Sequence, residues 1–371
     1  MAGIYIHIPF CKSRCIYCDF YSTTLIKWQD RYVNALIEEA KQRSDYLNNE
    51  IIDTLYIGGG TPSLLSKDNI SKLFDGLKNQ KLTEYIYETT FECNPDDVTD
   101  AFADTLVENG INRVSMGAQS FSNSRLKFLN RRHNADQINK AVYILKNYGI
   151  TNISIDLIFG FPEETLEEWI YDIKEAINLD VEHISAYSLM YEKGTLLNRM
   201  LNKGIIKEID EELSRNMYYT LIDILKDYGY IQYEISNFAR NGSISHHNSN
   251  YWKEIPYLGL GAGAHSYNKL SRQWNIDDIY SYMDSIEKGN ISFQKEVVDD
   301  NTRYNDMIST ALRTCSGIEI EKMPSYRDYL LKSADRSIKN GFLMIDNDHL
   351  RLTREGLYIS DDIMTDLIFT D

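Results

Sequence analysis

The sequence has only five cysteines in 371 residues, no long run of apolar residues and no excess of positive charge. Without a long apolar run, a helix that spans a bilayer is not expected. The net charge is −16, from 39 basic and 55 acidic residues, which argues against a protein that binds the phosphate backbone of nucleic acids. Nothing at the N-terminus resembles a secretory signal, so we expect a cytoplasmic protein without a disulfide framework.

The chain is long enough for one large domain and a smaller one. We predict a first domain over residues 1–195 and a second over residues 196–371. In the second, the spacing of apolar residues predicts a long helix over residues 211–228. The end of the chain is expected to form a helix up to residue 341, two short strands with a turn at residues 346–348, and a last helix from residue 354. This order is typical of a winged-helix-like cap.

Short β-rich segments alternate with amphipathic helical segments from residue 4 to about residue 190, which is typical of βα units around a parallel sheet. The six expected strands cover residues 4–8, 52–57, 86–92, 112–119, 152–159 and 182–189. We therefore predict an α/β fold, a partial (β/α)6 barrel followed by an α+β region. Thr165 and Glu168 are spaced for a capping box at the start of the sixth helix.

The alternation within the strands predicts which side faces the interior. In the fourth strand Val114, Met116 and Ala118 alternate with small and polar residues. A closed eight-stranded barrel fills its interior with bulky side chains, so a small and polar inner face predicts an open barrel that holds a ligand. Cys93 falls on the helix-facing side, and Cys315 falls in a segment expected to be helical. We expect both to be buried and neither to bind a metal.

The other three cysteines, Cys11, Cys15 and Cys18, form a C-x-x-x-C-x-x-C motif. A [4Fe–4S] cluster takes four ligands and is usually held by cysteine thiolates, so three cysteines leave one iron open to a second molecule. The alternative is a zinc site with three thiolates and a distant histidine, although such sites normally contain C-x-x-C pairs.

Further candidate residues follow the ends of the predicted strands, where parallel α/β sheets collect ligand-binding groups. The segment GGGTPS, at residues 58–63, lets the backbone come close to a ligand. Glu92 and Gln119 end the third and fourth strands, and Asp156 lies in the fifth. Arg131 is suited to a bidentate contact with a carboxylate. Each of these, taken alone, is equally compatible with an ordinary polar residue of a barrel.

These motifs resemble the radical S-adenosylmethionine (SAM) superfamily, and within it the coproporphyrinogen dehydrogenase branch. The similar segments are YIHIPFC, CIYCDF, GGGTPS, ECNPD, GAQSF, LNRRH, DLIFGFP and, after the barrel, YSLMYEKGT. The resemblance implies that Cys11, Cys15 and Cys18 bind the cluster and that Tyr5 lies near the cofactors. Whether Tyr5 takes part in catalysis is left open. It further implies that SAM contacts a set of polar and glycine residues: Tyr17, Gly59, Gly60, Thr61, Glu92, Gln119, Arg131 and Asp156.

The chain differs from the oxygen-independent coproporphyrinogen dehydrogenases in two respects. These enzymes have a fourth cysteine where this chain has Phe20, and they have a long N-terminal arm where this chain has only Met1 to Gly3 before the first strand. Both differences argue against decarboxylation of coproporphyrinogen.

The segment HNSNYW, at residues 247–252, is similar to the H-N-x-x-Y-W motif of the HemW-type heme chaperones. Histidine is a common axial ligand of heme iron, and aromatic rings stack on porphyrins. The resemblance implies that His247 binds the heme iron, with Asn248, Tyr251 and Trp252 around the heme. His246 is the second candidate for the iron ligand, and His265 is equally compatible with a structural hydrogen bond.

The resemblance thus implies a chaperone that binds a [4Fe–4S] cluster, SAM and heme and delivers heme to an acceptor protein. The alternative is an enzyme that decarboxylates coproporphyrinogen III with a 5′-deoxyadenosyl radical. Expected partners are heme, the acceptor and an electron donor such as flavodoxin or ferredoxin, without nucleic acid. Contact with a membrane is expected only transiently, through the acceptor. The sequence leaves open whether SAM is cleaved.

Overall fold

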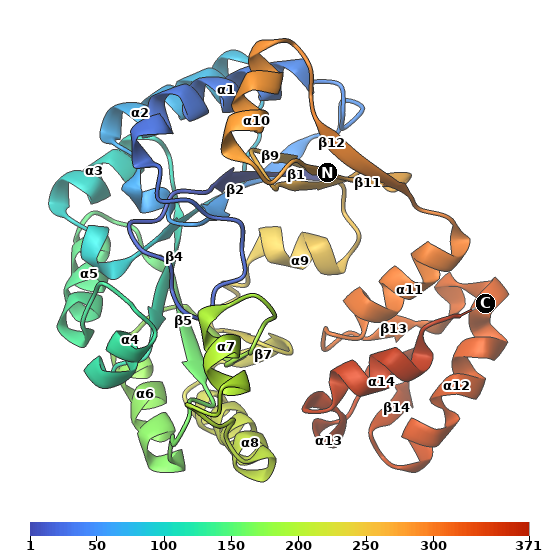
Figure 1. Cartoon of the computed structure of the whole chain (residues 1–371). Coiled ribbons are helices and arrows are strands. Elements are labelled where there is room, and N and C mark those ends of the chain that lie inside the picture. Colours follow the sequence, from blue (N-terminus) through green and yellow to red (C-terminus); the bar gives the residue numbers. More distant parts are fainter. Residues whose placement is uncertain (371) are drawn as a thin grey trace.

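A computed structural model describes residues 1–370, and its centre is a curved sheet whose six central strands are parallel (Figure 1). These strands are β1 (Ala2–Ile8), β2 (Ile52–Gly59), β3 (Glu88–Cys93), β4 (Arg113–Gln119), β5 (Asn152–Phe159) and β6 (His183–Ser188). The outer side carries helices α1 (Gln29–Gln42), α2 (Lys67–Asn79), α3 (Asp100–Glu108), α4 (Asn123–Phe128), α5 (Ala135–Asn147) and α6 (Leu166–Asn178). The predicted α/β partial barrel is confirmed.

The side chains of the strands divide as their alternation predicts. Val114, Met116 and Ala118 are buried in the main hydrophobic core, between the sheet and the helices. Ser115 and Gln119 face the other way and line a cavity on the inner side. Helix α6 begins with the predicted capping box, in which the Thr165 side chain accepts from the Glu168 N–H.

The sheet extends at both edges with strands that the sequence did not predict. Next to β1 lie β9 (Tyr257–Leu260), β10 (His265–Tyr267), β11 (Ser271–Asn275) and β12 (Phe293–Val297), and next to β6 lie β8 (Asn237–Ala239) and β7 (Ile231–Glu234). Strand β9 is parallel to β1, whereas β8 is antiparallel to β6. Residues beyond 195 therefore complete the same sheet, and the predicted domain boundary at that position stays a prediction.

Helices α7 (Leu196–Asn202), α8 (Glu211–Asp227), α9 (His246–Trp252) and α10 (Ile279–Glu287) lie between these strands. The short helix α9 occupies the concave side of the sheet (Figure 1). The final part contains α11 (Asp300–Ala311), β13 (Ile318–Glu319), α12 (Arg327–Lys339), β14 (Leu343–Asp346), β15 (His349–Leu352), α13 (Arg354–Leu357) and α14 (Ser360–Leu367). It has its own hydrophobic core around Tyr304, Leu330 and Leu350, and its helices and hairpin follow the order expected of a winged-helix-like cap.

The two cysteines outside the motif behave differently. Cys93 is 5% exposed and lies in the main core, as predicted. The prediction for Cys315 was wrong, because α11 ends at Ala311 and leaves Cys315 exposed in the turn that follows. Among residues 1–370, none of the helices is both long and apolar enough to cross a membrane.

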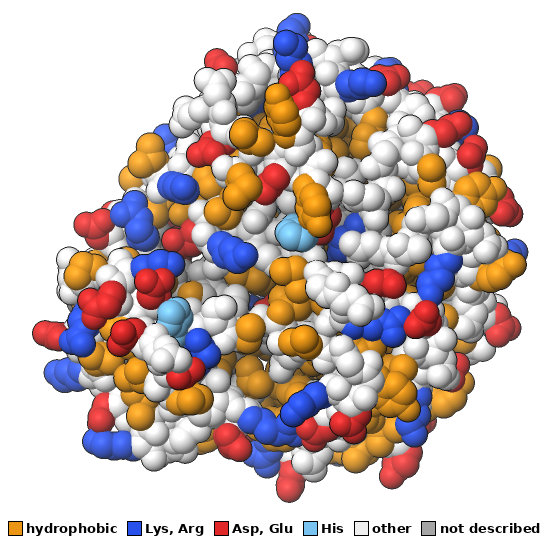
Figure 2. Space-filling model, turned by 180° about the vertical axis from the view of Figure 1, so that it is seen from behind, with side chains coloured by type: hydrophobic (Ala, Val, Ile, Leu, Met, Phe, Trp, Pro, Cys, Tyr) orange, Lys and Arg blue, Asp and Glu red, His pale blue; other side chains and the backbone are white. Residues whose placement is uncertain are grey.

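Acidic and basic side chains alternate over the face shown in Figure 2, with hydrophobic side chains between them. The net charge of −16 is therefore not accompanied by a continuous basic stripe on this face.

Candidate functional site

The inner side of the barrel contains a cavity of about 470 Å³, here called the cysteine cavity. All the residues predicted for the cluster and for SAM border it, although they come from many separate segments. They are Tyr5, Cys11, Cys15, Tyr17, Cys18, Gly59, Gly60, Thr61, Glu92, Gln119, Arg131 and Asp156. The fold therefore brings the predicted set together in one place.

The three cysteines lie on the loop that follows β1. The Cys11 sulfur is 3.6 Å from the Thr61 hydroxyl, and the Arg131 guanidinium donates to the Cys15 sulfur at 3.6 Å. Burial raises the pKa of Cys11, and it raises the pKa of Cys18 to about 11, so these thiols are protonated at neutral pH until a metal displaces the protons.

Within residues 1–370 no three His, Cys, Asp or Glu side chains are close enough to form a ready metal site. The cysteine loop must therefore bring its sulfurs together around a cluster. The donor set fits such a group, because three thiols border one cavity and the Arg131 guanidinium, which donates to the Cys15 sulfur, brings a positive charge next to them.

Gly59, at the end of β2, and Gly60, which follows it, are required by β1 and the start of the cysteine loop, which pack closely against them. Gly59 has a φ of +116°, and a Cβ there would lie 2.6 Å from the His7 ring. A Cβ on Gly60 would lie 2.9 Å from backbone atoms of Pro9 and Phe10. The Gly59 N–H donates to Glu92 at 3.1 Å, so the same glycine also fixes a carboxylate in the cavity.

Two half-buried carboxylates face the cysteine cavity. Desolvation raises the pKa of Glu92 to about 7, although the Tyr56 hydroxyl donates to it at 2.7 Å. Desolvation also raises the pKa of Asp156, which accepts weakly from the Ser115 hydroxyl at 3.4 Å. Both carboxylates are more stable as anions when a cationic group or a hydroxyl donor enters the cavity.

The opposite charge in the cavity comes from five basic residues, of which Arg131 and Arg113 belong to the interior. Arg131 donates to the Asn94 side chain and to the Gly117 carbonyl, both at 2.6 Å. Arg113 is 1% exposed, and among the described residues its Nε and Nη1 have no hydrogen-bond partner. Sequence reasoning missed Arg113, although it shares a strand face with Ser115 and this alternation was the available signal.

Gln119 ends β4 with a φ of +69°, a conformation that residues other than glycine seldom adopt. The register with β5 shifts at the same point, and the side chain is 8% exposed. Strained backbone conformations of this kind are common at ligand-binding sites, where contacts with the rest of the fold stabilise them.

The HNSNYW segment forms α9, and its first residue of interest, His247, is 1% exposed. The His247 Nδ1 lies 2.9 Å from the Thr54 hydroxyl and its Nε2 lies 2.9 Å from the Tyr251 hydroxyl. Burial lowers the pKa of His247 to about 3, so the ring is neutral. Both ring nitrogens are engaged, and the predicted ligation of heme iron by His247 requires α9 to move.

The fold separates the four residues of α9 that were predicted to surround heme. Asn248 borders the cysteine cavity, whereas Trp252 lies under the Arg313 guanidinium, 5.2 Å from its ring centroid. Tyr251 borders a second cavity of about 610 Å³, here called the aromatic cavity. Seven aromatic residues line it: Tyr5, Phe20, Tyr21, Tyr251, Tyr257, Trp274 and Phe293. Tyr5, Asp19 and Phe20 border both cavities, so the two are neighbours.

Comparison with known proteins agrees with this geometry. Residues 5–176 match the family model of the radical SAM superfamily, and residues 298–359 match that of the HemN C-terminal domain. The chain is 33% identical to the heme chaperone HemW of Bacillus subtilis over 98% of both chains, and 32% identical to that of Lactococcus lactis over 99% of this chain and 97% of the other. This chain belongs to the HemW family of the radical SAM superfamily.

Among solved structures, the HemW-family chain is similar to the coproporphyrinogen III oxidase HemN of Escherichia coli. The TM-score is 0.84 at 21% identity, and the match covers 99% of this chain and 90% of the other. At this identity the similarity establishes the shared fold, including the C-terminal part.

Proposed function

We propose that this HemW-family protein is a heme chaperone, which binds a [4Fe–4S] cluster, SAM and heme and passes heme to an acceptor protein. The observation that carries the proposal is the relationship over almost the whole chain to proteins named as heme chaperones. An aromatic cavity beside the cysteine cavity supports it, because a flat macrocycle can stack there.

In this proposal Cys11, Cys15 and Cys18 bind three irons of the cluster. When bound, the cluster supplies one-electron chemistry and one iron open to the SAM amino and carboxylate groups. Gly59 and Gly60 let the backbone approach SAM, and the Glu92 carboxylate favours its cationic groups. Arg131 balances negative charge, and Tyr5 closes the cavity on the side of the aromatic residues.

Four further parts of the proposal concern the surroundings of the protein. An electron donor such as flavodoxin or ferredoxin reduces the cluster, and the protein acts in the cytoplasm. It touches a membrane only transiently, through its acceptor. The division at residues 195 and 196 separates the part that binds cluster and SAM from the part that carries α9 and the C-terminal cap.

The test is a titration of anaerobically reconstituted protein with hemin, followed by measurement of iron and heme per chain on the same sample. We expect about four cluster irons and a heme Soret band that shifts on binding. A sample that carries the cluster but leaves the hemin spectrum unchanged would contradict the proposal.

A second candidate is oxidative decarboxylation of coproporphyrinogen III, favoured by the complete set of polar residues around the cysteine cavity. Phe20, which stands where the dehydrogenases have a cysteine, argues against it. Incubation of the reconstituted protein with reductant, SAM and coproporphyrinogen III distinguishes the two, because only the enzyme forms protoporphyrinogen.

A further inference from the structure

The aromatic cavity is bordered by a histidine that the α9 motif does not include. His265, at the start of β10, is exposed and stacks on Trp274 with ring centroids 5.9 Å apart and planes 22° apart. At about 610 Å³, the cavity is in the usual size range of small-molecule pockets.

His265 differs from the other histidines in the state of its ring nitrogens. Among residues 1–370, no hydrogen bond to either nitrogen of His265 is formed, whereas both nitrogens of His7, His183 and His247 are engaged. His246 also has a free ring, but it packs edge-on against Tyr87 and borders neither cavity. His265 is therefore the histidine that combines free nitrogens with a place in a cavity.

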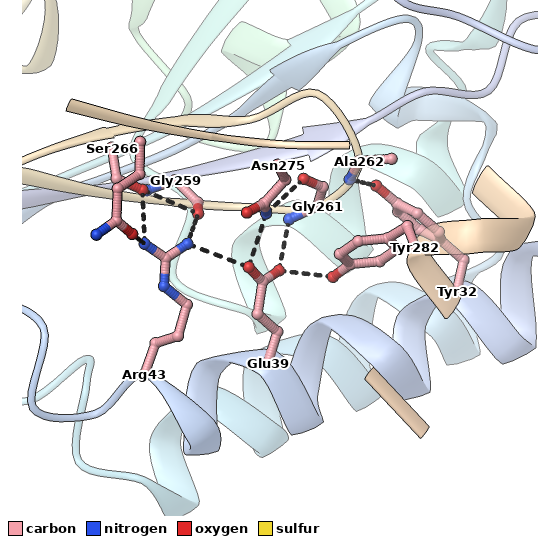
Figure 3. Close-up of polar contacts among 10 residues, drawn as sticks. Tyr32, Glu39, Arg43, Gly259, Gly261, Ala262, Ser266, Asn275 and Tyr282 are labelled. Carbon is pink, nitrogen blue, oxygen red and sulfur yellow. Dashed lines mark hydrogen bonds and ion pairs between the residues drawn. The ribbon is translucent and has the colours of Figure 1, made fainter. Parts of the chain in front are cut away.

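A buried network holds the loop that carries His265 (Figure 3). Glu39 of α1 is fully buried and accepts from the Gly261 N–H at 2.8 Å and from the Asn275 amide at 2.7 Å. Arg43 donates to the Gly259 carbonyl at 3.1 Å and to the Ser266 hydroxyl at 3.2 Å. The backbone is thus fixed on both sides of His265, as a binding site requires.

We infer that the aromatic cavity binds the heme and that His265 is the axial ligand of its iron. This inference rests on the proposed heme binding and replaces His247 as the ligand. Asp19 and Asp277 also border the cavity and repel the heme propionates. The macrocycle therefore enters with its apolar edge first, and its propionates face the solvent. His247 becomes a positioning residue, because it holds the hydroxyl of Tyr251 at the cavity wall.

The experiment compares hemin titrations of the full, reconstituted chain with those of His265→Gly, His247→Ala and His349→Ala, the last being a histidine of the C-terminal hairpin. We expect His265→Gly to weaken hemin binding at least tenfold and to change the ferric EPR spectrum, and added imidazole to restore both. His349→Ala should leave both unchanged. His247→Ala should weaken binding less and keep the wild-type EPR spectrum.

The outcomes separate the inference from the proposed function. A wild-type protein that does not bind hemin overturns the proposed function. A wild-type protein that binds hemin, together with a His265→Gly variant whose affinity and EPR spectrum match the wild type, overturns the inference alone. Iron content per chain and far-UV circular dichroism, compared among the variants, exclude a folding defect as the cause.

Discussion

Burial shifts the pKa values of single side chains in the cysteine cavity, and Glu92 shows this most clearly. Its pKa of about 7 means that it loses its proton between pH 6 and pH 8. A protonated Glu92 has no charge with which to attract the cationic groups of SAM.

We therefore expect the affinity for SAM to be level above pH 8 and to fall below pH 7, approaching about tenfold per pH unit. In Glu92→Gln this pH dependence should be lost, and the affinity should be low throughout. Isothermal titration calorimetry of SAM against pH measures it. Glu108→Gln, an exposed position on α3, is the control, and a wild-type profile that stays flat from pH 6 to pH 8 would contradict the assignment.

The five cysteines provide a second test at this scale. Replacement of Cys11 by serine removes a cluster ligand, so iron per chain and the cluster absorbance should fall by more than half. Cys315→Ser should leave both unchanged, because Cys315 is exposed in a turn far along the chain. If the serine variant of Cys11 retained a full cluster, the ligand assignment would be wrong.

How far a residue can be predicted from sequence depends on what surrounds it. The burial of Cys93 was predicted correctly from strand alternation, although Cys93, at the end of β3, also borders the cysteine cavity. His247 was predicted to bind the heme iron, which stays a prediction; the structure adds that its ring lies between Thr54 on β2 and Tyr251 one helical turn further on. A family motif carries no information about such burial, which arises only when α9 docks on the sheet.

At the level of elements, α9 closes the concave side of the sheet. Glu88 on β3 accepts from the backbone N–H groups of His246 and His247 at 3.0 and 2.9 Å, and the His247 ring stacks on Tyr56 with centroids 5.1 Å apart. The helix is short, and these few contacts hold it.

We expect His247→Ala to lower the free energy of unfolding by about 2–4 kcal/mol, because it leaves a buried void and two unpaired hydroxyls. Urea unfolding followed by circular dichroism measures this. His246→Ala, whose ring is half-buried against Tyr87, is the matched control and should cost less than about 1 kcal/mol. Equal losses in the two variants would show that the buried ring does not stabilise the helix.

The six central strands were predictable because each is long and has an alternating or apolar pattern. Strands β7 to β11 were not, since each has only three to five residues and depends on a neighbour for its pairing. Strand β9 joins β1 across more than 250 positions of sequence, a contact that no local pattern indicates.

The whole molecule has two main hydrophobic cores, one under the sheet and one in the C-terminal cap. They are bridged by exposed contacts such as the ion pair of Arg354 with Asp223 at 2.7 Å, in which both side chains are more than 40% exposed. Exposed ion pairs contribute little to stability, typically below about 1 kcal/mol.

We expect Leu350→Ala, in the core of the cap, to destabilise the cap by about 2–5 kcal/mol. Hydrogen exchange should rise over residues 300–370 while β1 to β6 stay protected, because each core has its own set of buried residues and Ile235 is the one described side chain given as packing against both. Asp223→Ala is the control and should leave both regions nearly unchanged. A rise in exchange that spreads evenly over β1 to β6 would show that the cap and the barrel unfold together.

Helix α9 also links the binding free energies of ligands in the two cavities. Residues of this helix border both cavities and, through the contact of Trp252 with Arg313, the C-terminal cap. A molecule that tightens or loosens this helix from one side changes its fit on the others. Thermodynamic linkage then requires reciprocity: whatever factor SAM imposes on the affinity for heme, heme imposes on the affinity for SAM.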